Sequence, residues 1–180
     1  METEQTARSV SVEILVNFDL DGYIDYGLTN DLETRERAQV REYVQNVLRK
    51  RSYLDFLIGE FSSITIEEMK PQLKNILRLG LYDMLFMDST PDYAAINEAV
   101  EIAKVTLGSK SGDLVNAILR NIQRDIGQLP KPAFEDRTKL VATTFSHPEW
   151  LVARWSRRLG EREAFQLMQA NNQNPTFFVR

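Results

Sequence analysis

Residues Pro91 to Arg120 read PDYAAINEAVEIAKVTLGSKSGDLVNAILR, which predicts two amphipathic helices joined by a Gly/Ser loop. Apolar residues of the first helix recur at steps of three and four and form its buried face: Ile96, Ala99, Val100 and Ala103. The second helix carries a stripe of the same kind: Leu114, Val115, Ile118, Leu119 and Ile122. Asn97 and Asn116 lie outside these stripes. We therefore expect an all-α fold in which the two helices pack against a common core.

The segments before this pair also have helical spacing. We expect one helix over residues 5–18, broken at Asp21-Gly22, and a short turn over residues 23–28. Thr34 is the expected N-cap of a helix whose spacing continues beyond the basic run at 49–51 to Phe61. Residues 69–87 are apolar almost all round and should form the central helix. Gly80 in its middle predicts close approach of another helix, because Gly there costs about 1 kcal/mol relative to Ala.

Composition limits the kind of protein and the chemistry. The chain has 180 residues, 43% of them hydrophobic, so it can bury a core. It has no cysteine and one histidine, which leaves no thiolate site and little material for a metal site, and we expect no metal. Neither a membrane-spanning run nor a signal peptide is evident, so we expect a soluble, cytoplasmic protein.

The formal net charge is -4, but charge is unevenly distributed. The first 33 residues carry eight acids and one base, Arg8, which leaves the remainder net basic. Clusters of bases can contact phosphates while the whole chain stays acidic. Two clusters are the candidate RNA-binding residues: Arg49, Lys50 and Arg51, and then Arg154, Arg157 and Arg158. The first cluster could instead be only a solvated helix junction.

The region after the helix pair changes character. Residues 127–138 hold Pro130 and Pro132 and read as a connector, and residues 139–175 read as a small helical linker subdomain. Ser146 and Glu149 have the spacing of a capping box, which explains Ser146-His147 without catalysis. Trp150 and Trp155 are expected to pack this linker onto its neighbours. Gly160 is expected to end the helix that carries them. Residues 176–180 have strand composition and read as the start of another region.

Four stretches together resemble one family: INEAVEIAK at 96–104, LVNAILR at 114–120, ILRLGLY at 76–82 and SHPEWLVARW at 146–155. They resemble the NusB family of RNA-binding helical domains. The Leu-Arg ending and the linker look more like the NusB-like domain that opens the RsmB (Sun, Fmu) ribosomal RNA cytosine-C5 methyltransferases. The positions that match the family motifs are Asn97, Glu98, Lys104, Asn116 and Arg120. Asn97, Glu98 and Asn116 could contact RNA or a docked domain, or make only interhelical and solvent hydrogen bonds.

The resemblance implies a NusB-like helical bundle over residues 1–126 that binds RNA and positions the substrate. The implied partners are ribosomal RNA and a C-terminal methyltransferase domain, with no membrane. S-adenosylmethionine and the catalytic cysteines of the family would belong to that catalytic domain, so this chain alone is expected to be no enzyme and to hold no cofactor. The chain departs from the family at Asn46, where Gly is favoured. It departs again in the first helix, where Arg8 stands alone among acids, so the RNA surface of that helix is not carried over.

Two other functions fit the sequence. One is a transcription antitermination factor that acts through RNA and protein contacts. The other is an interaction domain whose acidic residues 1–33 bind a basic protein.

Overall fold

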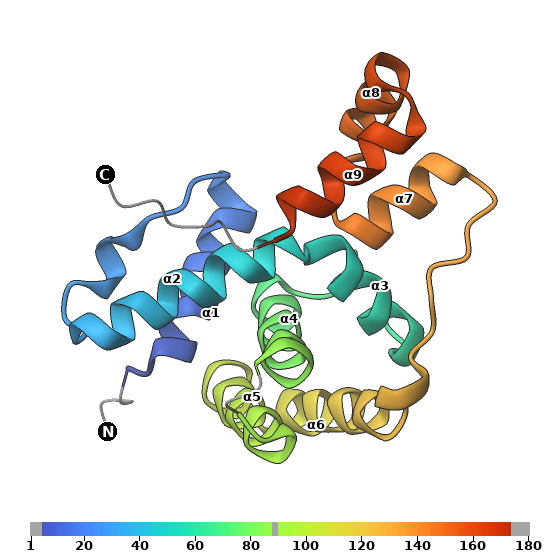
Figure 1. Cartoon of the computed structure of the whole chain (residues 1–180). Coiled ribbons are helices and arrows are strands. Elements are labelled where there is room, and N and C mark those ends of the chain that lie inside the picture. Colours follow the sequence, from blue (N-terminus) through green and yellow to red (C-terminus); the bar gives the residue numbers. More distant parts are fainter. Residues whose placement is uncertain (1–4, 88–89, 174–180) are drawn as a thin grey trace.

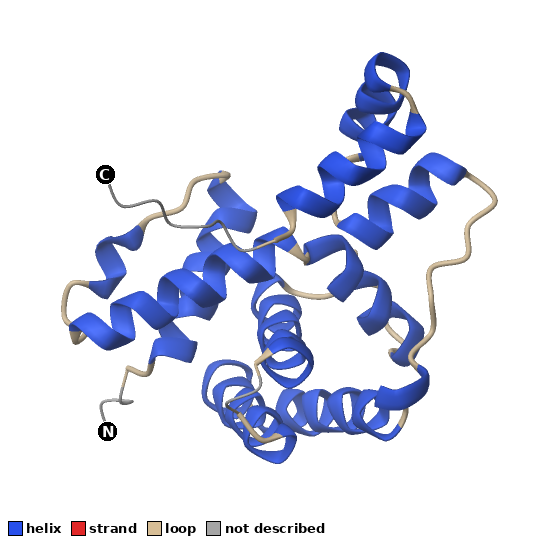
Figure 2. Ribbon diagram, in the orientation of Figure 1, coloured by secondary structure: helices blue, strands red, loops and turns tan. Residues whose placement is uncertain are grey.

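The computed structural model describes residues 5–87 and 90–173, and over these residues it consists of helices and loops without strands (Figures 1 and 2). The predicted all-α class is confirmed. The helices of this part of the chain are α1 (Ala7–Asp21), α2 (Thr34–Arg49), α3 (Arg51–Phe61), α4 (Pro71–Phe86), α5 (Asp92–Leu107), α6 (Ser109–Arg124), α7 (Arg137–Phe145), α8 (Glu149–Leu159) and α9 (Glu161–Asn171). Short 3-10 turns span Tyr26–Thr29 and Ile126–Gln128. The strand expected at residues 176–180 lies outside the described residues.

Helix α1 begins and ends where its sequence has capping residues. The Thr6 side chain accepts from the Ser9 backbone N–H, and the Ser9 hydroxyl accepts in turn from the Thr6 backbone N–H. At the other end Gly22 adopts a left-handed conformation with φ of 72°, which glycine tolerates without strain. The break predicted at Asp21-Gly22 is therefore confirmed.

Two predictions about the next helix were wrong. Thr34 is the first helical residue rather than the N-cap, which is Glu33, whose backbone N–H donates to the Glu36 side chain at 3.1 Å. The helix also does not run through the basic segment, because Lys50 leaves helical geometry with φ of −107° and ψ of 9° and separates α2 from α3. This break lets α3 turn across the end of α4 (Figure 1).

Helix α4 is the central helix, as its continuous apolar sequence predicted. It contacts α1, α2 and α3 on one side and α5 and α6 on the other. Figure 1 shows it nearly end-on in the middle of the bundle. Its buried residues lie on all of its faces and include three polar side chains: Asn75, Arg78 and Asp83. A charged group in such a position must find partners within the protein.

Gly80 of α4 lies where α5 and α6 cross it. A Cβ atom placed on Gly80 would lie 2.9 Å from the Ala99 Cβ and 3.0 Å from Leu119 Cδ1. Both distances are shorter than ordinary carbon–carbon contacts. The predicted close approach of another helix at Gly80 is confirmed, and the pair of helices quoted from the sequence provides both neighbours.

Helices α7, α8 and α9 form a smaller helical group with a core of their own: Ala142, Val152, Ala164 and Met168. The segment between this group and the main bundle is held by aromatic contacts, since the Phe134 ring meets the Phe56 ring of α3 edge-on at 6.2 Å. The residue boundaries of the domains given above remain predictions.

Ser146 does not act as the predicted N-cap of α8. That helix begins at Glu149 with Pro148 as its N-cap, and Ser146 is instead the C-cap of α7 in a left-handed conformation with φ of 52°. An N-cap residue needs an extended backbone, so this conformation excludes the capping box. The Ser146 hydroxyl accepts a hydrogen bond at 3.0 Å from the Tyr53 backbone N–H in the first turn of α3. Ser146 thus caps a helix from a distant part of the chain and holds α7 against the main bundle.

Candidate nucleic-acid interface

The arginines of α8 lie together on its exposed side. Arg157 and Arg158 follow Arg154 at three and four positions, which places both next to Arg154 on one helix face. All three are exposed, and no ion pair joins them to a carboxylate of the described residues. Arg157 and Arg158 also complement the negative end of the helix dipole in the last turn. Their guanidinium groups remain available to a phosphate ligand.

The other predicted cluster stands at the junction of α2 and α3, where every member has an intramolecular contact. Arg49 donates to the Asn46 side chain at 2.8 Å, which gives Asn46 a local partner. Lys50 places its Nζ 4.3 Å from the centre of the Phe86 ring. Burial lowers the pKa of Lys50, and the neighbouring Arg49 charge lowers it further. These residues are half-buried, so this cluster is partly structural.

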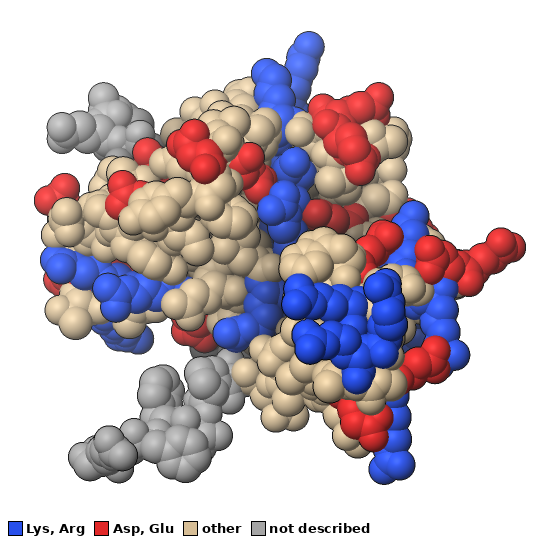
Figure 3. Space-filling view, turned by 90° about the horizontal axis from the view of Figure 1, so that it is seen from above, with Lys and Arg blue, Asp and Glu red and all other residues tan. Residues whose placement is uncertain are grey.

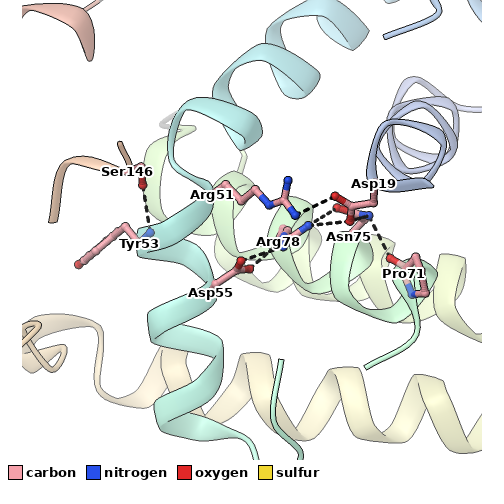
Figure 4. A network of polar contacts seen from close by, with 8 residues as sticks. All are labelled: Asp19, Arg51, Tyr53, Asp55, Pro71, Asn75, Arg78 and Ser146. Atoms are coloured by element: carbon pink, nitrogen blue, oxygen red, sulfur yellow. Dashed lines mark hydrogen bonds and ion pairs between the residues drawn. The ribbon is translucent and has the colours of Figure 1, made fainter. Parts of the chain in front are cut away.

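Arg51, the third member, belongs to a buried polar network (Figure 4). Its Nη2 lies 3.0 Å from Asp19 of α1, and the same carboxylate pairs with Arg78 of α4 at 3.0 Å. Arg78 is 1% exposed and also binds both carboxylate oxygens of Asp55, at 2.7 and 2.8 Å. Asn75 donates to Asp19 at 2.9 Å and accepts from Arg78. The network therefore joins α1, α3 and α4 and fixes the start of α3, beside which Ser146 is docked.

Lys and Arg side chains gather on one face of the molecule (Figure 3). Figure 3 looks down on the end that carries α8 and α9, and Lys and Arg side chains gather there and in a band between this group and the half formed by α1 and α2. The hydrogen bond from Tyr53 to Ser146 places the start of α3 next to the turn that leads into α8. The first basic cluster thus lies at the start of the helix that docks against Ser146, and the second lies on the helix that follows this residue.

Arg8, the single base of the acidic N-terminal segment, is directed into the protein. Its Nη2 lies 2.7 Å from the carboxylate of Asp83, which is 1% exposed. The Tyr43 hydroxyl donates to the same carboxylate at 3.3 Å, so the three residues join α1, α2 and α4. Burial raises the pKa of Tyr43 to about 12, and the Asp83 charge adds to the shift. Arg8 is therefore a structural residue.

The family-motif residues lie on α5 and α6. Asn97, Glu98 and Asn116 are exposed, and Arg120 is half-buried and donates to Gln123 at 3.0 Å. Lys104 pairs with Glu101 at 2.7 Å, and its methylene stem covers Gly112, where an added Cβ would meet Lys104 Cγ at 2.5 Å. Lys104 and Gly112 thus bring the ends of α5 and α6 together.

The two tryptophans have different surroundings. Trp155 is half-buried against the core of α7–α9, with its ring 5.5 Å from that of His147, as the packing prediction required. Trp150 is 64% exposed, so the prediction that it packs on its neighbours was wrong. His147 is held by a 2.7 Å contact between its Nδ1 and the Phe145 carbonyl oxygen. Sequence reasoning missed Trp150 as a surface residue because exposure of an apolar side chain cannot be read from helical spacing alone.

A groove of about 630 Å³ runs between α1 and α5 on another part of the surface. Its floor is apolar and includes Val12, Val16 and Ile102. Glutamates line its rim: Glu13, Glu98 and Glu101. The groove suits an apolar ligand with positive charge.

No cluster of three or more His, Cys, Asp or Glu side chains that could hold a metal ion occurs in the described ranges. Within the same ranges, no helix has the length and apolar character that crossing a membrane requires.

The bundle formed by α1 to α6 has the NusB fold, and α7 to α9 follow it in the described residues. The NusB family model matches residues 5–124, and the chain belongs to the NusB family. A solved structure of the antitermination factors NusB and NusE in complex with dsRNA has the same fold. It superposes on 66% of this chain and 93% of its own with a TM-score of 0.61 at 22% identity.

More particularly, the chain matches the N-terminal part of ribosomal RNA small subunit methyltransferase B. The probable enzyme of this name from Bacillus subtilis is 39% identical over 132 residues, which is 73% of this chain and 29% of that protein. The probable enzyme from Synechocystis is 29% identical over 181 residues, 97% of this chain and 40% of that protein. The chain therefore spans less than half the length of these relatives.

Proposed function

We propose that this chain binds RNA and positions the substrate as the N-terminal domain of an S-adenosylmethionine-dependent small-subunit ribosomal RNA cytosine-C5 methyltransferase. The observation that carries the proposal is the exposed face of Arg154, Arg157 and Arg158 on α8, the helix that follows the turn docked at the start of α3. The names of its methyltransferase relatives support ribosomal RNA as the class of RNA. We place this role in the cytoplasm.

In this proposal the chain binds the RNA, and a separate catalytic domain transfers the methyl group. The chain has no cysteine, so the nucleophile that the family uses and the bound S-adenosylmethionine would belong to residues outside these 180. The chain's own contribution would be electrostatic, because arginines that neutralise phosphates release counterions from the RNA. Titration of the chain with S-adenosylmethionine in a calorimeter should give no binding heat. Stoichiometric binding would contradict this division.

The test is a salt titration of binding to a small-subunit ribosomal RNA hairpin with an unpaired loop. The slope of log affinity against log salt changes by roughly 0.7 for each phosphate contact with a single strand. Replacing Arg154, Arg157 and Arg158 together by Gln should therefore flatten the slope by about 2 units.

A matched control removes the same charge from the opposite end of the molecule, with Gln at Lys110, Arg124 and Lys131. These exposed residues lie on α6 and in the connector. The control should change the slope much less. Equal slopes for the parent and the α8 variant, or failure of the parent to bind the hairpin, would contradict the proposal.

A second candidate, antitermination through RNA and protein contacts, is favoured by the groove between α1 and α5. Its apolar floor and glutamate rim suit a basic amphipathic helix of a protein partner. A Leu/Lys helical peptide should shift the NMR signals of Val12, Val16 and Ile102. Gln at all three rim glutamates should weaken that binding. Unchanged groove signals would eliminate this candidate.

A further inference from the structure

The exposed indole of Trp150 lies in the first turn of α8 without a neighbour that explains it. Trp150 is 64% exposed, whereas large aromatic side chains stabilise a fold mainly when they are buried. The other aromatic residues of this subdomain are accounted for. Trp155 packs on the core beside His147, and Phe165, although partly exposed, meets the Phe145 ring at 4.6 Å.

Helix geometry places this indole on the same side as the arginines. Arg154, Arg157 and Arg158 follow Trp150 at four, seven and eight positions, the spacing of one helix face. Together the four residues cover about 100° of the helix circumference, at 3.6 residues per turn. Val152, which is 2% exposed, lies on the opposite side and attaches α8 to the subdomain core. The face that carries Trp150 is therefore the face directed at solvent.

An exposed indole beside three guanidinium groups fits single-stranded RNA. An aromatic ring can stack on any unpaired base, and arginines beside it can contact the phosphates on either side. The bases of an RNA duplex are already stacked and inaccessible to a side chain on a convex helix. A protein partner would also cover an indole, but three positive charges beside it that form no ion pair with a described carboxylate favour a polyanion.

We propose that Trp150 stacks on an unpaired base of the RNA while Arg154, Arg157 and Arg158 contact the neighbouring phosphates. This inference rests on the proposed RNA-binding function and adds that the α8 face binds unpaired rather than duplex RNA. It predicts that the chain prefers an unpaired loop or a single strand over a duplex of the same sequence.

The chain contains two tryptophans, so Trp155→Phe leaves Trp150 as the one fluorophore of this kind. In this variant a single-stranded oligonucleotide from a ribosomal RNA loop should quench the tryptophan fluorescence. The same strand annealed to its complement should quench it much less.

Binding is then measured for Trp150→Ala in the otherwise unchanged chain. Affinity for the single strand should fall by about 5- to 150-fold, the range for loss of one stacked base. The salt slope should stay the same because no charge is removed, and Trp150→Phe should restore part of the affinity. Leu159→Ala is the control, since Leu159 is exposed on the same helix but away from this face. Circular dichroism should give equal melting temperatures for the Trp150 variants and the parent.

The outcomes separate the two proposals. If the parent binds RNA with the expected salt slope but Trp150→Ala binds equally well, stacking is refuted and the proposed function survives. Equal quenching by the duplex would also refute the preference for unpaired bases. If the parent binds no RNA, both proposals fail.

Discussion

Replacing Gly80 by Ala tests the packing of the central helix with the smallest possible change. Alanine is the better helix former by about 1 kcal/mol, so an unhindered site would be stabilised. At this site the new Cβ would lie 2.9 Å from the Ala99 Cβ and 3.0 Å from Leu119 Cδ1. Leu119 can change its rotamer, but the Ala99 Cβ is fixed to the backbone of α5, so that helix must move away.

Overpacking of this kind costs about 1 to 3 kcal/mol. It therefore exceeds the gain in helix propensity, and we expect a net loss of roughly 1 kcal/mol in the free energy of unfolding. A loss of this size lowers the melting temperature of a domain of this length by about 2 to 4 °C. Gly80→Leu adds more atoms at the same point and should destabilise the protein more.

Urea unfolding followed by circular dichroism measures these changes, and Gly59→Ala is the matched control. Gly59 also lies inside a helix, α3, but a Cβ added there would meet no atom within 4 Å. Gly59→Ala should therefore stabilise the protein by about 0.4 to 1 kcal/mol. If Gly80→Ala raises the melting temperature as Gly59→Ala does, α5 does not approach α4 as closely as this structure requires.

Three further perturbations test the polar contacts. Arg8→Gln leaves the buried Asp83 carboxylate without its ion pair and should lower the free energy of unfolding by roughly 2 to 4 kcal/mol in urea, while leaving the salt slope of RNA binding unchanged. The Tyr43 pKa is about 12 in the fold and about 10 in the unfolded chain. The contribution of this group to stability is therefore complete below pH 10 and is lost as the pH rises through 12. Tyr43→Phe should make the free energy of unfolding less dependent on pH in this window. Ser146→Ala should cost about 1 kcal/mol and speed hydrogen exchange at the Tyr53 amide, whereas Ser146→Gly should cost less because glycine relieves the left-handed backbone.

The main bundle could be predicted from the sequence because its evidence is local. Apolar spacing within α5 and α6 fixes which faces are buried, and the continuous apolar pattern of α4 marks it as central. Gly80 was informative for the same reason, since a glycine inside such a helix needs a compensating contact. The position of the break between α2 and α3 was not predicted, because lysine, the residue at the break, is not a residue type that ends helices.

The candidate site depended on contacts between residues that are far apart in the chain. Arg8 and Asp83 are 75 positions apart, and Ser146 and Tyr53 are 93 apart, so no local pattern could pair them. Ser146 was misassigned because the spacing of Ser146 and Glu149 satisfies a capping box in sequence, whereas the left-handed backbone at Ser146 excludes one. The basic clusters could be identified from the sequence, but the exposure of Trp150 could not.

The basic surface depends on how α7 is attached to the bundle. The start of α3 is fixed from one side by the buried network of Arg78 and from the other by the Ser146 hydroxyl. Helix α7 also packs against α3, so this packing, the Ser146 hydrogen bond and the contact between Phe134 and Phe56 together hold the subdomain on the bundle. The single arginine of the acidic N-terminal segment is paired with Asp83, so its charge is directed into the protein. If the proposed RNA-binding face is correct, it combines described residues of the bundle and the subdomain, and a NusB-like bundle alone would lack the arginines and the indole of α8.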